Sequence, residues 1–134
     1  MAGYSGTPLP KKLGIKQGAR VATLNAPAGF EATLGELPPG ALVAKFRGGP
    51  ADVALLFARD RPALAASFLD LAEAIRPAGG LWVCWPKRAS GVPTDLDENS
   101  IRDYGLQQGL VDNKVCAVDE MWSGLRFVYR LKDR

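Results

Sequence analysis

The stretch from Gly79 to Lys87, read Gly-Gly-Leu-Trp-Val-Cys-Trp-Pro-Lys, constrains the fold more than any other part of the sequence. A dense apolar and aromatic run that follows glycines and stops at a proline is typical of a central strand buried on both faces of a sheet. Arg88 and Ser90 come soon after it. If the strand belongs to an open α/β sheet, these polar residues lie at its carboxyl end, where such sheets bind ligands.

Length and composition predict one domain spanning residues 1–134. Hydrophobic residues make up 47% of the chain and charged residues 23%, as in ordinary globular proteins. Residues 1–19 are predicted to form an irregular arm that packs through Leu9, Leu13 and Ile15. No window approaches the roughly 18 apolar residues of a membrane span, and the first residues lack the order of a signal peptide. We therefore expect a soluble cytoplasmic protein with no membrane partner.

The net charge of +3 comes from scattered basic residues, and only Lys11-Lys12 and Lys87-Arg88 are adjacent pairs. Nucleic-acid binders usually concentrate basic residues in a patch, so this distribution does not favour a nucleic-acid partner. The two cysteines, Cys84 and Cys116, lie in apolar runs where a thiol acts as a small hydrophobic group. The absence of histidine excludes His-dependent triads, and with no close cysteine pair we expect no zinc site.

Apolar periodicity and turn residues predict strands that alternate with helices and end in an antiparallel hairpin. A helix capped by Asp60 is expected over 61–76, and another, capped by Thr94 or Asp95, is expected to run to about Gln108. A short helix is expected over 31–37. In the last strand Leu125, Phe127, Tyr129 and Leu131 are expected to share a buried face. The predicted strands are 21–26, 41–46, 52–58, 79–87, 111–119 and 125–131.

This pattern predicts a three-layer α/β fold with a mostly parallel sheet. The direction of the second strand stays open, because only Arg47 to Ala51 join it to the third. A parallel crossover normally needs a dozen or more residues. The link is therefore either stretched across the sheet, or the second strand runs antiparallel at an edge.

If the other strands before the hairpin are parallel, their carboxyl ends share one rim. That rim carries residues 25–30, 59–60, 85–90 and the hairpin turn 119–124. Its catalytic candidates are Lys87, Asp119 and Glu120, although Lys87 could instead pair with either carboxylate, and the tryptophans could simply pack at the rim. The ligand-binding candidates are Asn25, Gly29, Phe30, Trp85, Lys87, Ser90, Glu120, Trp122 and Ser123.

Four motifs stand in order along the chain: Gly3 to Leu9, Lys11 to Ile15, Trp85 to Lys87 with Ser90 to Val92, and Lys114 to Glu120 continuing through Trp122 to Leu125 and on to Arg134. Together they resemble the bacterial family catalogued as domain of unknown function 3052. This resemblance covers the whole chain and implies a small bacterial cytoplasmic protein, with no established activity to carry over.

A looser resemblance is to class I S-adenosylmethionine-dependent methyltransferases. Gly14 to Val21 is similar to the approach to their first strand, and Arg76 to Val83 to the turn before their fifth. The resemblance implies a Rossmann-like fold and S-adenosylmethionine as cofactor. Those enzymes carry a glycine-rich acidic motif after strand one, whereas Leu24 to Phe30 has one glycine and no acid. Lys45 and Arg47 follow strand two, where those enzymes use an acid for the ribose hydroxyls.

These departures favour a non-catalytic Rossmann-like module that binds a small ligand or a protein partner at the rim. The alternative is a divergent methyltransferase of a small acceptor, in which Asp119 or Glu120 orients the nucleophile and Trp122 covers the cofactor. In the methyltransferase strand order, the last strand lies between those bearing Cys84 and Cys116. Two strand spacings, about 9.6 Å, exceed the roughly 7 Å limit for a disulfide, so two free thiols are predicted.

Overall fold

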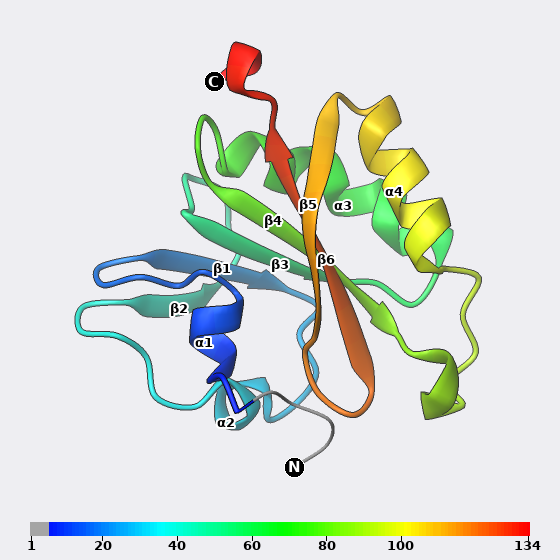
Figure 1. Ribbon diagram of the computed structural model, residues 1–134, viewed down its shortest axis with the longest axis horizontal. Helices are drawn as coiled ribbons and strands as arrows, with labels where there is room; N and C mark the ends of the chain where they lie inside the picture. The colour runs from blue at the N-terminus through cyan, green and yellow to red at the C-terminus, as the bar shows by residue number, and fades with distance from the viewer. Residues whose placement is uncertain (1–5) are drawn as a thin grey trace.

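The computed structural model describes residues 6–134, and its sheet has six strands in the order β2-β1-β3-β4-β6-β5 (Figure 1). β1 to β4 run parallel, and β6 is antiparallel to both of its neighbours, β4 and β5. The predicted α/β class and the insertion of the last strand between β4 and β5 are confirmed. The strands are β1 (Arg20–Leu24), β2 (Leu42–Lys45), β3 (Val53–Phe57), β4 (Gly80–Pro86), β5 (Leu110–Ala117) and β6 (Trp122–Tyr129).

Helices cover both faces of this sheet, which gives three layers (Figure 1). α3 (Arg61–Ala74) and α4 (Glu98–Gln107) cover one face, while α1 (Leu9–Lys12) and α2 (Phe30–Leu34) cover the other. Asp60 caps α3 as predicted, because its carboxylate accepts the N–H of Ala63 at 2.9 Å. The predicted apolar face of α3, formed by Leu64, Phe68, Leu71 and Ile75, is buried.

All seven residues of β4 are buried, as the sequence predicts for the central strand. The Trp82 side chain has no exposed surface, and its indole N–H donates to the carbonyl of Leu13 at 3.0 Å. That bond connects the N-terminal arm to the middle of the sheet. Leu13 and Ile15 are buried there, and Leu9 is half-buried against the same cluster. Gly3 to Ser5, which begin the first motif, lie outside the described residues.

β2 lies at the edge of the sheet and pairs parallel with β1, with Val43 opposite Val21. The link over residues 46–52 therefore crosses from one side of β1 to the other without a helix. Gly48 and Gly49 allow this crossing because both have positive φ, at 94° and 86°. The stretched crossing is thus the alternative that the structure adopts.

Two predicted helix ends are wrong. Asp97, not Thr94 or Asp95, caps α4: its carboxylate accepts the N–H of Ser100 at 2.7 Å, and the Ser100 hydroxyl accepts the N–H of Asp97. Asp95 instead accepts the N–H of Arg61 at 2.9 Å, which connects the loop before α4 to the start of α3. α2 ends at Leu34 rather than residue 37, because Gly35 takes a φ of 79°.

The closing hairpin also differs from the prediction. β6 begins at Trp122, three residues early, because the carbonyl of Trp122 accepts the N–H of Val118 at 2.9 Å and closes a tight turn. The strand ends at Tyr129, so Leu131 lies in the short helix η2 (Leu131–Asp133) and is 80% exposed instead of buried. Val128, which alternates with the residues of the predicted buried face, is itself only 5% exposed.

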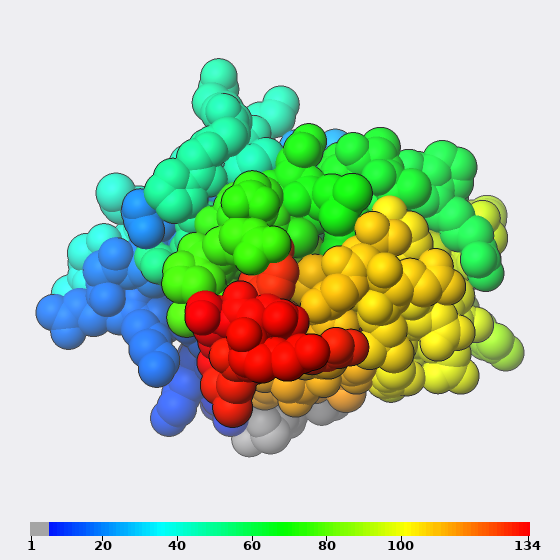
Figure 2. Space-filling model, turned by 90° about the horizontal axis from the view of Figure 1, so that it is seen from above, coloured from blue at the N-terminus to red at the C-terminus, as the bar shows by residue number. Residues whose placement is uncertain are grey.

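In Figure 2 the molecule is seen from the edge where β4 begins and β6 ends. There the last residues of the chain pack between the turn after α3 and the start of β5, as both figures show. The candidate residues lie at the opposite edge, where β1, β3 and β4 end. In the described part of the chain, no helix is long and apolar enough to cross a membrane.

Candidate functional site

The end of β4 and the start of β6 bring four of the predicted site residues together. Trp85 lies opposite Ser123, and Trp122 lies opposite Pro86 in the antiparallel register. The backbone N–H of Lys87 donates to the carbonyl of Met121 at 2.8 Å, so the pairing continues past the strand. The predicted convergence of the loop after β4 with the hairpin turn is therefore present.

Several polar groups in this cluster hold the loops in place. One carboxylate oxygen of Asp119 accepts the N–H groups of both Met121 and Trp122, each at 2.8 Å. The Ser90 hydroxyl donates to the carbonyl of Lys87 at 2.6 Å within the short helix η1 (Arg88–Ser90). Among the described residues, Lys87 forms no ion pair with Asp119 or with the exposed Glu120. Asp119 and Ser90 thus shape the hairpin turn and the loop after β4.

The aromatic side chains of the rim are packed in the protein. Trp85 is 8% exposed and Trp122 is 3% exposed. Phe57 lies between Phe30 and Trp122 and packs edge-on against each, with ring centroids 5.0 and 5.1 Å apart. The guanidinium of Arg59 lies 5.9 Å from the Trp122 ring centroid. The rings of Phe30, Phe57 and Trp122 thus pack together between the carboxyl ends of β1 and β3 and the start of β6, while Trp85 packs in the other apolar cluster.

A hollow of about 480 Å³ lies at the carboxyl ends of β1 and β2. Three predicted site residues, Asn25, Gly29 and Phe30, are in its wall. Asn25 and Gly29 both have positive φ, at 60° and 80°, so the chain turns sharply away from the end of β1. The whole wall consists of Thr23, Asn25, Ala26, Pro27, Ala28, Gly29, Phe30, Glu31, Val43, Ala44 and Lys45.

Sequence reasoning did not include Glu31 and Lys45 among the site residues. Lys45 ends β2, and it lies beside Thr23 in the parallel register with β1. Its place in the wall depends on the direction of β2, which the sequence left open. The signal that could have found it is the basic residue at the end of the second strand, once that strand is known to be parallel.

The thiols do not offer nucleophiles. Burial raises the pKa of Cys84 well above its ordinary value, and nearby Cys116 raises it further. Burial also raises the pKa of Cys116. A thiol that stays protonated is a poor nucleophile and metal ligand. Among the described residues, no group of three His, Cys, Asp or Glu side chains could hold a metal ion.

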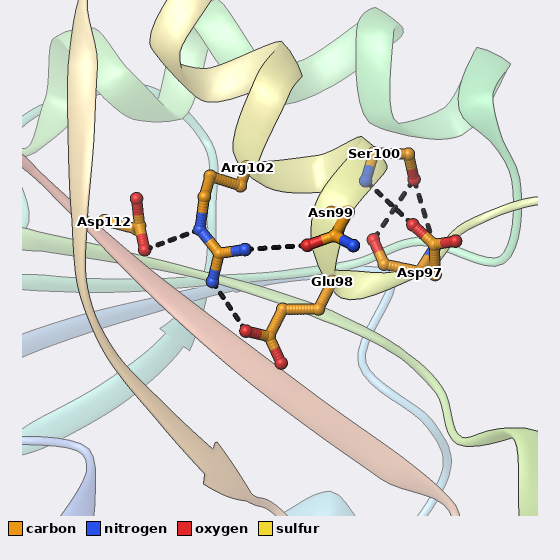
Figure 3. A network of polar contacts seen from close by, with 6 residues as sticks. All are labelled: Asp97, Glu98, Asn99, Ser100, Arg102 and Asp112. Atoms are coloured by element: carbon orange, nitrogen blue, oxygen red, sulfur yellow. Dashed lines mark hydrogen bonds and ion pairs between the residues drawn. The ribbon is translucent and has the colours of Figure 1, made fainter.

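The sequence analysis also missed a polar network between α4 and β5 (Figure 3). Arg102 donates to Glu98 at 2.5 Å, to Asp112 at 2.9 Å and to Asn99 at 3.0 Å. The hydrogen bond to Glu98 is the main cause, and the one to Asp112 the second, that raises the pKa of the guanidinium above its ordinary value. The four-residue spacing of Glu98 and Arg102 was the available signal. This network lies on the helix surface and joins two elements of the fold.

No family model and no curated protein matches the chain, so the resemblance to domain of unknown function 3052 is not confirmed. Solved structures do match. A SAM-dependent methyltransferase from Aquifex aeolicus has a TM-score of 0.62 and 15% identity, with 87% of this chain and 85% of that chain covered. Magnesium protoporphyrin IX methyltransferase from Synechocystis PCC 6803, with bound SAM, has a TM-score of 0.55 and 10% identity, covering 91% and 74%.

A third match is the release factor-specific protein-(glutamine-N5) methyltransferase from Alicyclobacillus acidocaldarius. It has a TM-score of 0.51 and 13% identity, with 90% of this chain and 87% of that chain covered. Identities this low show a shared fold, and function resides in the site rather than in the fold. The chain therefore has the Rossmann-like fold of class I SAM-dependent methyltransferases.

Proposed function

We propose that the protein is a non-catalytic Rossmann-like module that binds a small ligand at the carboxyl ends of β1 and β2. The observation that carries this proposal is the hollow of about 480 Å³ at that place. Its volume is in the range of small-molecule sites, and ligands of open α/β sheets bind outside the carboxyl ends of the strands.

The positions of the reactive side chains support binding without catalysis. Lys87, Asp119 and Glu120 follow β4 and β5, whereas the hollow lies at β1 and β2. The packed rings of Phe30, Phe57 and Trp122 occupy the space between. A ligand in the hollow would meet backbone, small side chains and two charged groups, with no activated nucleophile.

The second candidate function is methyl transfer from S-adenosylmethionine. It is favoured by the fold and by the place of the hollow, directly after β1, where the resemblance to methyltransferases puts the cofactor. The same segment has one glycine where those enzymes have several. A third candidate function is binding of a protein partner at the rim. Trp122 and its neighbours are packed there, so this part of the rim offers a closed surface and not a ligand cavity.

The test is to titrate adenosine and S-adenosylhomocysteine into the protein and follow backbone amide resonances together with heats of binding. If the hollow is the site, resonances of residues 25–31 and 43–45 shift, and those of 87–92 and 119–123 do not. Ala28→Trp, which fills the hollow, should abolish binding. Ala66→Trp on the exposed side of α3 is the matched control and should retain it.

The outcomes separate the candidates. Adenosine that binds in the hollow as tightly as S-adenosylhomocysteine supports the non-catalytic module. Preference for S-adenosylhomocysteine by about tenfold or more (1.4 kcal/mol) would favour the methyltransferase reading. If neither compound shifts residues of the hollow, a nucleoside site at this place is contradicted.

A further inference from the structure

We infer that the hollow at β1 and β2 selects a nucleoside whose ribose carries a phosphate group. This inference rests on the proposed function and specifies the ligand class. It depends on Lys45, the last residue of β2, and on the groups that surround its ammonium.

Lys45 is placed to meet the sugar of a bound nucleoside. It lies next to Thr23 in the register of β1 and β2, and both residues are in the wall of the hollow. In doubly wound folds the residue after the second strand reads the ribose: a carboxylate accepts the hydroxyl protons of an unmodified sugar, and a basic group accommodates a ribose phosphate.

The chemistry of the ammonium decides between those two sugars. A lysine ammonium donates three hydrogen bonds and accepts none, so it cannot accept the protons of two ribose hydroxyls. It can donate to phosphate oxygens, and hydrogen bonds between two charged groups are about twice as strong as neutral ones. A phosphorylated ribose therefore gains more binding free energy from Lys45 than an unmodified ribose does.

The ammonium is also free to make this contact. Lys45 is exposed and forms no ion pair among the described residues, and Glu31, the carboxylate in the same wall, is not bonded to it. Arg47 follows two residues later and lies with Lys45 along a neighbouring depression. The end of β2 is thus positively charged. The Glu31 carboxylate can accept hydrogen bonds from ribose hydroxyls or from a base, and the Asn25 amide can donate or accept them.

The experiment compares adenosine with adenosine 2′-monophosphate by isothermal titration of the full chain, with amide shifts reporting the site. The phosphate should tighten binding by roughly tenfold or more, and the gain should shrink with added salt. Lys45→Gln should remove the gain. Lys16→Gln, an exposed lysine outside the hollow, is the matched control and should keep the gain.

Different outcomes overturn the two proposals. Equal affinities for both compounds in the hollow, or a gain that survives Lys45→Gln, would contradict the phosphate inference and leave the hollow as a binding site. Binding of neither compound would contradict a nucleoside site in the hollow, and shifts confined to residues 87–92 and 119–123 would overturn the proposed function as well. Glu31→Gln serves as a second check: it removes a negative charge from the wall that holds Lys45, so the gain from the phosphate should persist or increase.

Discussion

Cys84 and Cys116 lie on opposite sides of Gly124, each paired with it in the register of β6 with its two neighbours. Two strand spacings put their Cα atoms about 9.6 Å apart, beyond the roughly 7 Å limit for a disulfide. Both thiols are free, as the strand order predicted. Gly124 itself is tightly surrounded, because a Cβ there would lie 3.0 Å from the Trp82 ring.

The first prediction concerns thiol reactivity. Cys84 has no exposed surface and Cys116 is half-buried, and burial keeps both thiols protonated. Iodoacetamide at pH 8 should therefore leave Cys84 unmodified in the folded protein and modify Cys116 slowly. In denaturant both should react, as mass spectrometry of the peptides would show. Recovery of a peptide pair joined by a disulfide from unreduced protein would contradict the strand order.

The second prediction is that stability falls as the pH rises above about 8.5, the ordinary thiol pKa. The unfolded chain ionises its thiols there, while the folded chain keeps Cys84 neutral, so the unfolded state gains the advantage. One such group contributes a slope of at most about 1.4 kcal/mol per pH unit. Urea unfolding between pH 8 and 9.5 measures this slope below the range of Tyr129, whose pKa burial also raises.

Cys84→Ala is the matched variant for that measurement. It removes the most buried thiol, so the decline of unfolding free energy with pH should become less steep, while the half-buried Cys116 keeps its smaller contribution. An unchanged slope in Cys84→Ala would show that other groups cause the decline.

The third prediction is that Gly105→Ala destabilises the protein, although Gly→Ala in a helix usually stabilises it by about 1 kcal/mol. A Cβ at Gly105 in α4 would overlap the Phe127 ring. Phe127 is fully buried and packs edge-on against Phe68, so the ring has little room to move. We expect a loss of about 1–3 kcal/mol in urea unfolding.

The exposed neighbour Gln107→Ala is the control for helix propensity and should change stability by less than about 0.5 kcal/mol. Combining Gly105→Ala with Phe127→Leu should cost less than the sum of the two single changes, because the smaller side chain makes room for the methyl group. Additive losses would mean that Phe127 is not the group that the new Cβ meets.

The sequence predicted the layers and the central strand because those depend on long apolar patterns. The buried face of α3 and the complete burial of β4 follow from the spacing of residues such as Phe68 and Trp82. The direction of β2 could not be predicted, because the short link over residues 46–52 is compatible with two topologies. The positive φ angles of Gly48 and Gly49 allow the crossing, and the sequence alone does not show which backbone angles a glycine adopts.

The candidate site was predicted only in part, for related reasons. Asn25, Gly29 and Phe30 were found because they follow a strand that was recognised, whereas Lys45 depends on the direction of β2. The rim residues Trp85 and Trp122 lie on neighbouring strands but in different apolar clusters. Trp122 is buried with edge-on packing against Phe57, a contact between distant segments. Local sequence does not encode which side chain fills such a space.

The last prediction tests the structural role of Asp119 in the hairpin turn. Its Oδ1 accepts the N–H groups of Met121 and Trp122, so the carboxylate organises the hairpin turn. Asp119→Ala leaves both donors without this partner and should cost about 1–3 kcal/mol. Asp119→Asn keeps an oxygen acceptor and loses the charge, so its cost should be below about 1 kcal/mol. Glu120→Ala, at the exposed neighbour, should have no effect on stability.

Urea unfolding gives the free energies. The indole N–H resonance of Trp122, one of three tryptophans, reports the turn, because that indole is 3% exposed in the folded protein. The Ala variant should show a more exposed indole under native conditions, and the Asn variant should not. If Asp119→Asn is as damaging to stability as Asp119→Ala, the charge of the carboxylate matters beyond its two hydrogen bonds.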